Sequence, residues 1–223
     1  MPGHFIVLEG GDGVGKTTQV GLLSSWMDAA GVAHVVTREP GGTPVGEAIR
    51  ALVLSRPELE MPPESELLLI LAARAAFVRD VVRPALAEGK TVVADRFALS
   101  TLAYQGYGRG IDLGRIRDGL EIATGGLRPD LYLVLDLPVE EGSERQQRAG
   151  GEPDRIEREG EGFRRAVRDG YLALSGSEPG VEVVNARGTR EEVHERVRDR
   201  IGARFPGTYP GVGRSRESDG IGT

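Results

Sequence analysis

The stretch Gly10-Gly11-Asp12-Gly13-Val14-Gly15-Lys16-Thr17 decides the fold of this chain. It matches the pattern G-x-x-x-x-G-K-[ST], follows an apolar run at residues 5–8 and precedes a helical pattern. In such a loop the glycines let backbone N–H groups turn toward phosphate oxygens, and the next helix adds the positive end of its dipole. Lys16 is expected to reach the β- and γ-phosphates of a nucleotide, and the Thr17 hydroxyl to bind Mg²⁺. The stretch therefore predicts a nucleotide-phosphate site between a strand and a helix.

Two further observations separate this loop from a glycine-rich turn without a ligand and from a GTPase. Of the 28 Lys and Arg residues only Lys16 and Lys90 are lysines, so a chain that otherwise uses arginine has a lysine in the loop. A GTPase would carry an Asn-Lys-x-Asp guanine site, whereas the single asparagine is Asn185, within Asn-Ala-Arg-Gly. A large motor ATPase is disfavoured by the length of 223 residues. A small-molecule kinase is the class that remains.

Composition limits where the chain works and what it binds. Hydrophobic residues are 39% of the chain, enough for one core, and no window approaches the ~18 apolar residues of a membrane span. The first residues show no basic segment or cleavage site of a secretory signal. There is no cysteine, which excludes disulfides and thiolate metal sites and fits a reducing cytoplasm. The net charge of −6 argues against nucleic acid as a partner. The composition predicts a cytoplasmic domain without a membrane or nucleic-acid partner.

Five short apolar runs alternate with helical patterns, which predicts a three-layer α/β domain. The runs are residues 5–8, 32–37, 91–94, 131–135 and 181–184, and each is apolar enough to be buried on both faces of a parallel sheet. A helix is predicted over 64–88, with Pro84 kinking or shortening it, and another from Thr189 to about Arg204. Residues 1–205 are predicted to form one domain. The glycine-rich segment 206–223 is predicted to be a flexible tail.

In parallel sheets ligands bind beyond the carboxyl ends of the strands, so the residues that follow the runs are candidates for chemistry. Asp95 and Arg96 follow the third run, where a carboxylate can hold Mg²⁺ and a guanidinium can bind a phosphate; the alternative is a surface salt bridge. Arg38 ends the second run within Thr-Arg-Glu-Pro-Gly-Gly-Thr, although by itself it is more often an ordinary loop arginine. These residues predict a second phosphate site beside the loop.

Two longer segments carry groups suited to a base and to phosphates. Residues 100–110 combine hydroxyl, amide and aromatic side chains, which can bind the edge of a base; the alternative is a solvated loop. Residues 145–168 contain seven arginines interleaved with carboxylates, and the alternative there is a mixed-charge helix pair. With the phosphate loop present, Arg148 and Arg155 are predicted to belong to a lid at about 143–160 that closes over the phosphates.

Together these segments resemble the bacterial thymidylate kinases from about residue 4 to residue 204. The most specific matches are Thr-Arg-Glu-Pro-Gly-Gly at 37–42 and Ala-Tyr-Gln-Gly-x-x-Arg-Gly at 103–110, and Asp-Arg-Ile-Glu at 154–157 also matches. The resemblance implies a P-loop NTPase fold with a five-stranded parallel sheet, helices on both faces, a mobile lid and a homodimer. It also implies that the protein phosphorylates dTMP to dTDP with ATP and Mg²⁺, a step in the synthesis of dTTP.

The resemblance also assigns roles by position. For dTMP it implies that Asp12 contacts the sugar 3′-hydroxyl, that Arg38, Arg50 and Arg96 hold the phosphate, and that Arg74, Thr101 and Gln105, with Ser100 nearby, address thymine. It implies that Thr17 and Asp95 bind the metal. The residues that it implies for ATP binding are Gly10, Gly11, Asp12, Gly13, Val14, Gly15, Lys16, Thr17 and Thr18. The catalytic set is Lys16, Arg96, Arg155 and Arg148, because the loop itself contains no arginine and the lid must supply it.

Ile70 departs from the family pattern, which has a phenylalanine four residues before Arg74 to stack on thymine. Loss of the aromatic contact of about 0.5–1.5 kcal/mol predicts weaker dTMP binding, or a neighbouring aromatic residue in its place. Two alternatives stay open: a kinase for another nucleoside monophosphate, and a nucleotide-binding regulator that has lost turnover. The apolar stretch 67–77 fits either a dimer contact or the core.

Overall fold

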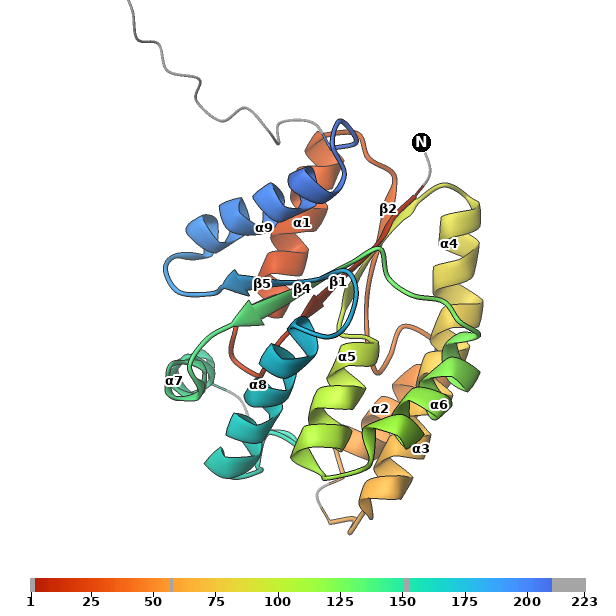
Figure 1. Ribbon diagram of the computed structural model, residues 1–223, viewed down its shortest axis with the longest axis vertical. Coiled ribbons are helices and arrows are strands. Elements are labelled where there is room, and N and C mark those ends of the chain that lie inside the picture. Colours follow the sequence, from red (N-terminus) through yellow and green to blue (C-terminus); the bar gives the residue numbers. More distant parts are fainter. Residues whose placement is uncertain (1–2, 57, 151–152, 210–223) are drawn as a thin grey trace, which may run out of the picture.

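The computed structural model describes residues 3–56, 58–150 and 153–209 and shows one five-stranded sheet between two layers of helices (Figure 1). Its strands are β1 (Phe5–Glu9), β2 (His34–Arg38), β3 (Thr91–Asp95), β4 (Leu131–Asp136) and β5 (Val181–Asn185). All four pairings are parallel, in the order β2-β3-β1-β4-β5. The α/β class and the five-stranded parallel sheet are confirmed.

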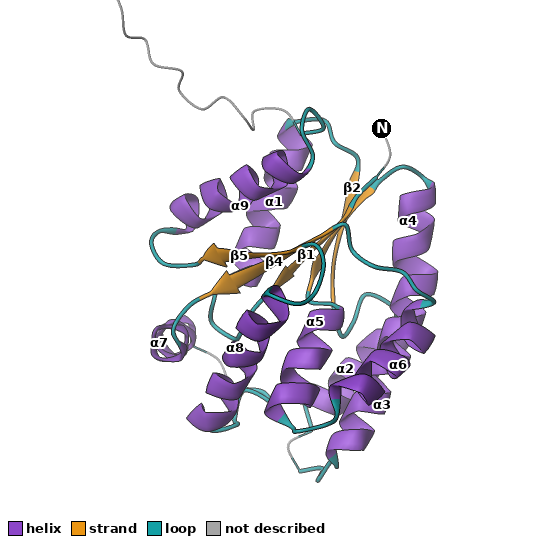
Figure 2. Cartoon of the chain, viewed as in Figure 1, coloured by secondary structure: helices purple, strands orange, loops and turns teal. Residues whose placement is uncertain are grey.

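Helices cover both faces of this sheet (Figure 2). In the described ranges the α-helices are α1 (Lys16–Ala29), α2 (Pro44–Leu54), α3 (Pro63–Phe77), α4 (Arg83–Ala87), α5 (Ala98–Thr101), α6 (Leu113–Thr124), α7 (Val139–Ala149), α8 (Glu161–Ser175) and α9 (Arg190–Arg204), with π-helical stretches η1 (Val78–Val82) and η2 (Leu102–Gly108). Helices α1 and α9 pack on one face, and α3, α5, α6 and α8 lie on the other. None of these described helices is long and apolar enough to cross a membrane.

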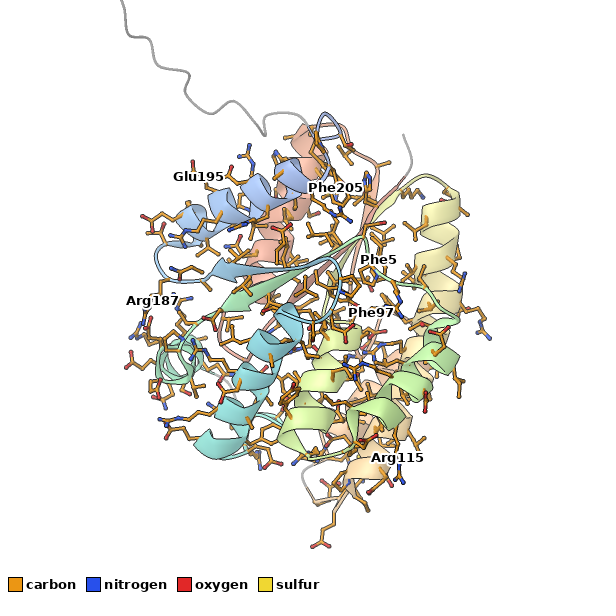
Figure 3. The ribbon with its side chains drawn as sticks, in the orientation of Figure 1. Phe5, Phe97, Arg115, Arg187, Glu195 and Phe205 are labelled. Atoms are coloured by element: carbon orange, nitrogen blue, oxygen red, sulfur yellow. The ribbon has the colours of Figure 1, made fainter. Side chains whose placement is uncertain are left out.

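Each face of the sheet has its own apolar core. On one face Phe5 meets Phe97 edge to face, with ring centroids 5.0 Å apart. On the other face Ile6 and Leu8 pack against residues of α1 and α9. Figure 3 places Phe5 and Phe97 in the interior and Arg115, Arg187 and Glu195 at the surface. Packing on both faces of the sheet fixes the positions of the carboxyl ends of the strands, and the polar candidate residues follow these ends.

The structure corrects three details of the predicted elements. The second strand begins at His34, and the two outer strands β2 and β5 are only partly buried because each has a neighbour on one side alone. The predicted helix 64–88 is divided by η1, where the Arg83 N–H donates to the Val78 carbonyl, just before Pro84 removes a donor from the helical ladder. Thr189 and Glu192 form the capping box expected at the start of the last helix.

The predicted tail begins too early. Tyr209 is buried, and its ring packs near Trp26 and Phe205. Its hydroxyl lies 3.2 Å from the Thr91 hydroxyl and 3.0 Å from the His4 ring. An aromatic ring with hydrogen-bond partners has a reason to dock, so the packed domain extends at least to residue 209. The rest of the predicted tail, 210–223, lies outside the described residues.

Candidate active site

The phosphate loop connects the central strand β1 to α1, as predicted. Gly10, Gly13 and Gly15 all have positive φ. A Cβ on Gly13 would lie 2.1 Å from the carbonyl oxygen of Gly142 on α7, so only glycine fits there. Helix α1 begins at Lys16, which places its N-terminal N–H groups at the loop. The loop is therefore an anion site held between the sheet and α7.

The Lys16 ammonium lies inside this loop. Its Nζ donates to the carbonyl oxygens of Gly10 at 3.1 Å and Gly11 at 2.6 Å, and the residue is 7% exposed. Burial, together with the nearby charge of Arg96, lowers the pKa of Lys16 to about 8. The side chain is therefore still mostly protonated at neutral pH, and a cation is in place for a phosphate.

Thr17 and Asp95 meet at the carboxyl end of β3. The Thr17 hydroxyl donates to Asp95 Oδ2 at 2.9 Å. Within the described ranges, no three His, Cys, Asp or Glu side chains come together as a metal site. Mg²⁺ usually keeps several waters and takes only one or two protein oxygens beside substrate phosphates. One hydroxyl and one carboxylate fit that ion, and Thr17 and Asp95 are the residues that would hold it.

Arg96 is a cation held by several partners in the site. Its guanidinium is ion-paired with Asp12, donates to the Tyr104 hydroxyl at 2.9 Å and to the Gly10 carbonyl at 3.0 Å. Tyr104 also donates to Asp12 Oδ2 at 2.9 Å. Burial by itself would raise the pKa of Asp12, but the charges of Arg96 and Lys16 outweigh it and the pKa lies below its ordinary value. Asp12 is thus ionised and fixed within the loop.

The backbone of Arg96 also marks the site. Its φ of +75° is the only positive φ of a non-glycine residue in the part of the chain that the structure describes. Such a conformation costs about 1–3 kcal/mol and persists where the surroundings fix it. The Arg96 N–H donates to the Leu8 carbonyl at 2.9 Å, and its side chain has the partners given above. The strained backbone of Arg96 therefore orients the guanidinium that is a candidate for phosphate binding.

A buried carboxylate, Glu9, supports this cation from behind. It accepts from the Ser100 hydroxyl at 2.6 Å, the Tyr171 hydroxyl at 3.0 Å and the Phe97 N–H at 2.9 Å. The Arg96 Nη1 donates in turn to Ser100 at 3.3 Å and Tyr171 at 3.2 Å. Burial raises the pKa of Glu9. Glu9 therefore orients the hydroxyls on which Arg96 rests.

Arg74 on α3 forms the opposite wall. It is almost fully buried, with Nε donating to Glu39 at 2.7 Å, Nη1 to the Thr101 hydroxyl at 2.7 Å and Nη2 to the Phe97 carbonyl at 3.0 Å. Burial raises the pKa of Glu39 to about 7, and its Oε1 has no hydrogen-bond partner. Hydrogen bonds from Nε, Nη1 and Nη2 therefore fix the orientation of the Arg74 guanidinium without a ligand.

Arg38 and Arg50 lie on the rim at the end of β2 and on α2. Arg38 pairs with Glu47 at 3.1 Å, and Arg50 donates to the Pro40 carbonyl at 3.1 Å. Burial and the charge of Arg38 lower the pKa of Arg50. Arg38 and Arg50 carry two positive charges and Glu47 one negative charge, so the rim keeps a net positive charge that can attract an anion.

One cleft of about 690 Å³ connects these groups. It joins the phosphate loop to the Arg74 wall, so two ligands can meet end to end. The predicted residues that line it are Asp12, Gly13, Val14, Gly15, Lys16, Thr17, Thr18, Arg38, Arg50, Ile70, Arg74, Asp95, Arg96, Ser100, Thr101 and Gln105. Gly10 and Gly11 line an adjoining small cavity.

A family model described as thymidylate kinase matches residues 8–197. The chain belongs to the thymidylate kinase family. The thymidylate kinase of Pelotomaculum thermopropionicum is 50% identical over 195 residues, covering 87% of this chain and 90% of that protein. The thymidylate kinase of Deinococcus radiodurans is 50% identical over 177 residues, covering 79% and 85%. A crystal structure of thymidylate kinase from Ehrlichia chaffeensis aligns with a TM-score of 0.70 at 32% identity, covering 88% of this chain and 97% of that one.

The structure does not bring the two predicted lid arginines of this family member to the cleft. Arg148, on α7, is exposed and pairs with Glu144 at 2.7 Å. Arg155 donates to the Val53 carbonyl at 2.8 Å and is ion-paired with Glu66. Residues 151–152 of the predicted lid lie outside the described residues. The catalytic role of both arginines stays a prediction that requires them to exchange partners.

Three residues of the site, two lining the cleft and one behind it, were missed from the sequence. Arg145 on α7 lines the cleft and donates to the Ala186 carbonyl at 3.1 Å, although its spacing gave no reason to prefer it over its neighbours. Tyr104 was within the segment singled out, and its position between Ser100 and Gln105 on η2 was the available signal. Glu9 ends an otherwise apolar strand at the loop, and a lone carboxylate there was a second signal.

Proposed function

We propose that this protein transfers the terminal phosphate of ATP to dTMP, giving ADP and dTDP. The observation that carries the proposal is the single cleft in which Lys16 and Thr17 at one end face the arginines of an acceptor site at the other. Membership of the thymidylate kinase family names the acceptor. Phosphoryl transfer needs two substrates held in line and charge neutralised around the phosphate. The loop and the acceptor arginines support the first requirement, and Lys16 supports part of the second.

On the acceptor side each group has a task that its chemistry suits. Arg96, with Arg38 and Arg50 at the rim, holds the dTMP phosphate through forked donors. Asp12 accepts from the sugar 3′-hydroxyl, and its ionised state supports that role. Arg74, Thr101 and Gln105, with Ser100 nearby, surround the base, and Ile70 packs against its face. The phosphate of dTMP is already an ionised nucleophile at pH 7, so no general base is required.

On the donor side the P-loop N–H groups and Lys16 bind the ATP phosphates. Thr17 and Asp95 would hold Mg²⁺, which supplies charge neutralisation on the phosphate oxygens when it is bound. Arg155, supported by Arg148, is proposed to leave its carboxylate partner and stabilise the charge of the transferred group. Arg145 already lines the cleft and is the alternative lid cation. If Arg155 acts, turnover falls more in Arg155→Ala than in Arg145→Ala, and if Arg145 acts, the order is reversed.

A cytoplasmic homodimer is proposed as the working form. Among the described residues, Leu68 on α3 is 65% exposed and Ile122 on α6 is 86% exposed, and these two helices pack against each other. Exposed apolar side chains on two helices that pack together favour a protein contact. Light scattering after gel filtration should give twice the 23.9 kDa of the chain, and Leu68→Glu should shift the population toward monomer.

A coupled ADP-release assay tests the proposed reaction. ATP and Mg²⁺ are supplied with dTMP, dUMP, dCMP, dGMP or AMP, with Lys16→Met as the background. We expect dTMP to give by far the highest kcat/KM, with dUMP a poorer substrate because one methyl group is worth only ~1–3 kcal/mol. ATP binding without ADP release for any acceptor would overturn the proposal.

A further inference from the structure

Glu66 on α3 is a buried carboxylate that the reaction itself does not use. It is 1% exposed and accepts hydrogen bonds from Gln105 Nε2 at 2.8 Å, from Arg109 Nη2 at 3.1 Å and from Arg155. It lies eight residues before Arg74 on the same helix, so both side chains fall on one helix face. Glu66 therefore sits behind the end of the cleft where the base is proposed to bind.

The chemistry of this contact fixes the orientation of the Gln105 amide. An ionised carboxylate has no hydrogen to donate, so only the NH₂ end of the amide can face it, and Oε1 must turn the other way. Gln105 is itself 1% exposed and lines the cleft. No described residue donates to Gln105 Oε1. The NH₂ end of the amide is thus turned toward Glu66, and Oε1 is the end left to accept from a ligand.

Two arginines keep Glu66 ionised, and only an ionised Glu66 holds the amide in one orientation. Burial by itself would raise the pKa of Glu66, but the hydrogen bonds from Arg155, Gln105 and Arg109 outweigh it and hold the pKa below the ordinary value. Arg109 is ion-paired in addition with Glu159 on the outer side. The carboxylate is held from several directions, so it does not turn with the amide.

Arg74 presents the opposite kind of group beside this acceptor. A guanidinium carries five N–H donors. The contacts with Glu39, Thr101 and the Phe97 carbonyl take four of them at most, which leaves one on Nη1. Arg74 and Gln105 line the same cleft, so a donor from one and an acceptor from the other are available to one ligand. Thymine and uracil have the complementary edge, a carbonyl oxygen next to a ring N–H, whereas cytosine has an amino group next to an unprotonated ring nitrogen.

We propose that Glu66 is a positioning residue that sets the base specificity of the cleft by holding the Gln105 amide with its oxygen toward the base. This inference rests on the proposed dTMP kinase activity and adds the device that excludes cytosine. Without Glu66 the amide can rotate by half a turn and offer its NH₂ to the ring nitrogen of cytosine. The thymine methyl group plays no part in this step, so dTMP and dUMP are affected alike.

The test compares kcat/KM for dTMP, dUMP and dCMP in the wild type and in Glu66→Gln. A glutamine at 66 can donate as well as accept, so Gln105 is no longer forced into one orientation. Mispairing one buried polar group predicts a fall of roughly 10–100-fold in the dTMP-to-dCMP ratio. The dTMP-to-dUMP ratio and the KM for ATP should stay within about twofold of wild type, which general damage to the fold would not produce.

Two further variants make the result decisive. In a Gln105→Met background the ratio should already be low, and adding Glu66→Gln should change it no further, because the two residues act through one contact. Glu159→Gln is the matched control, since it removes another partner of Arg109 and leaves the Glu66–Gln105 contact intact; the ratio should not move.

A folded Glu66→Gln protein with the wild-type dTMP-to-dCMP ratio would overturn the inference. If Glu66→Gln does not fold, Gln105→Met decides alone, and an unchanged ratio there would overturn it equally. Absence of dTMP turnover in the wild type would overturn the proposed function instead, so the two failures are distinguishable.

Discussion

The arginines of the acceptor wall and the arginines of the lid segment differ in how they are held. Arg74 is almost fully buried, and its hydrogen bonds tie it to the walls of the cleft. Arg96 is similarly held by Asp12, Tyr104 and backbone oxygen. Arg148 is exposed on α7 and pairs with Glu144, whereas Arg155 is as buried as Arg96 but is held by the Val53 carbonyl and Glu66, away from the phosphate loop.

This difference fits two proposed roles for arginine, binding of the acceptor and stabilisation of the transferred phosphate. The groups proposed to bind the acceptor are positioned before the substrate arrives, so little ordering is required on binding. The proposed lid cation is needed only when both substrates are present, and without them Arg148 and Arg155 are paired with Glu144 and Glu66. The predictions below test whether the fixed and the exchangeable groups are separable.

The largest effect is expected at the fixed cation of the phosphate loop. Lys16→Met should lower kcat by on the order of 10³-fold, because a preorganised charge on the phosphates is lost. The Kd for dTMP should stay within about threefold, since the acceptor wall is intact. Steady-state rates and calorimetric dTMP titration measure the two quantities. A loss of dTMP binding equal to the loss in kcat would show that donor and acceptor ends are not separable.

The next effect is on stability and sharpens the contrast between buried and exposed arginines. Arg74→Ala leaves the buried Glu39 carboxylate without its partner and should lower the free energy of unfolding by about 3–5 kcal/mol. Arg148→Ala, the matched control, should change it by less than ~0.5 kcal/mol, because exposed pairs contribute little. Chemical denaturation of both variants gives the comparison, and equal losses would contradict the distinction.

The smallest effect concerns the apolar side of the base site. Ile70→Phe should tighten dTMP binding by about 2–10-fold, since an aromatic contact is worth about 0.5–1.5 kcal/mol. Ile70→Leu, which keeps the volume but adds no ring, should leave the Kd nearly unchanged. Equal effects of the two substitutions would show that Ile70 does not contact the base.

The sequence predicted the sheet, the loop and most of the cleft because these depend on local patterns. Apolar runs gave the five strands, and G-x-x-x-x-G-K-[ST] required one backbone shape. Arg38, Asp95 and Arg96 could be placed because parallel strands bring their carboxyl ends to one edge, and Arg38 and Asp95 are indeed register partners.

What the sequence did not predict depends on contacts between distant segments. The support of Arg96 by Glu9 and Tyr171 joins residues 162 positions apart, and no local pattern encodes it. The docking of Tyr209 on Thr91 is of the same kind. The partners of Arg155 in α2 and α3 were equally out of reach, because charge spacing in a segment does not say which carboxylate each arginine meets.

The rate of ADP formation by Arg155→Ala at saturating ATP and dTMP tests the central claim most directly. If Arg155 leaves Glu66 to stabilise the transferred phosphate, kcat should fall by on the order of 10³-fold, as for Lys16→Met, while the Kd for dTMP stays within about threefold. A kcat near that of the wild type would contradict the account and would restrict Arg155 to holding Glu66 in place.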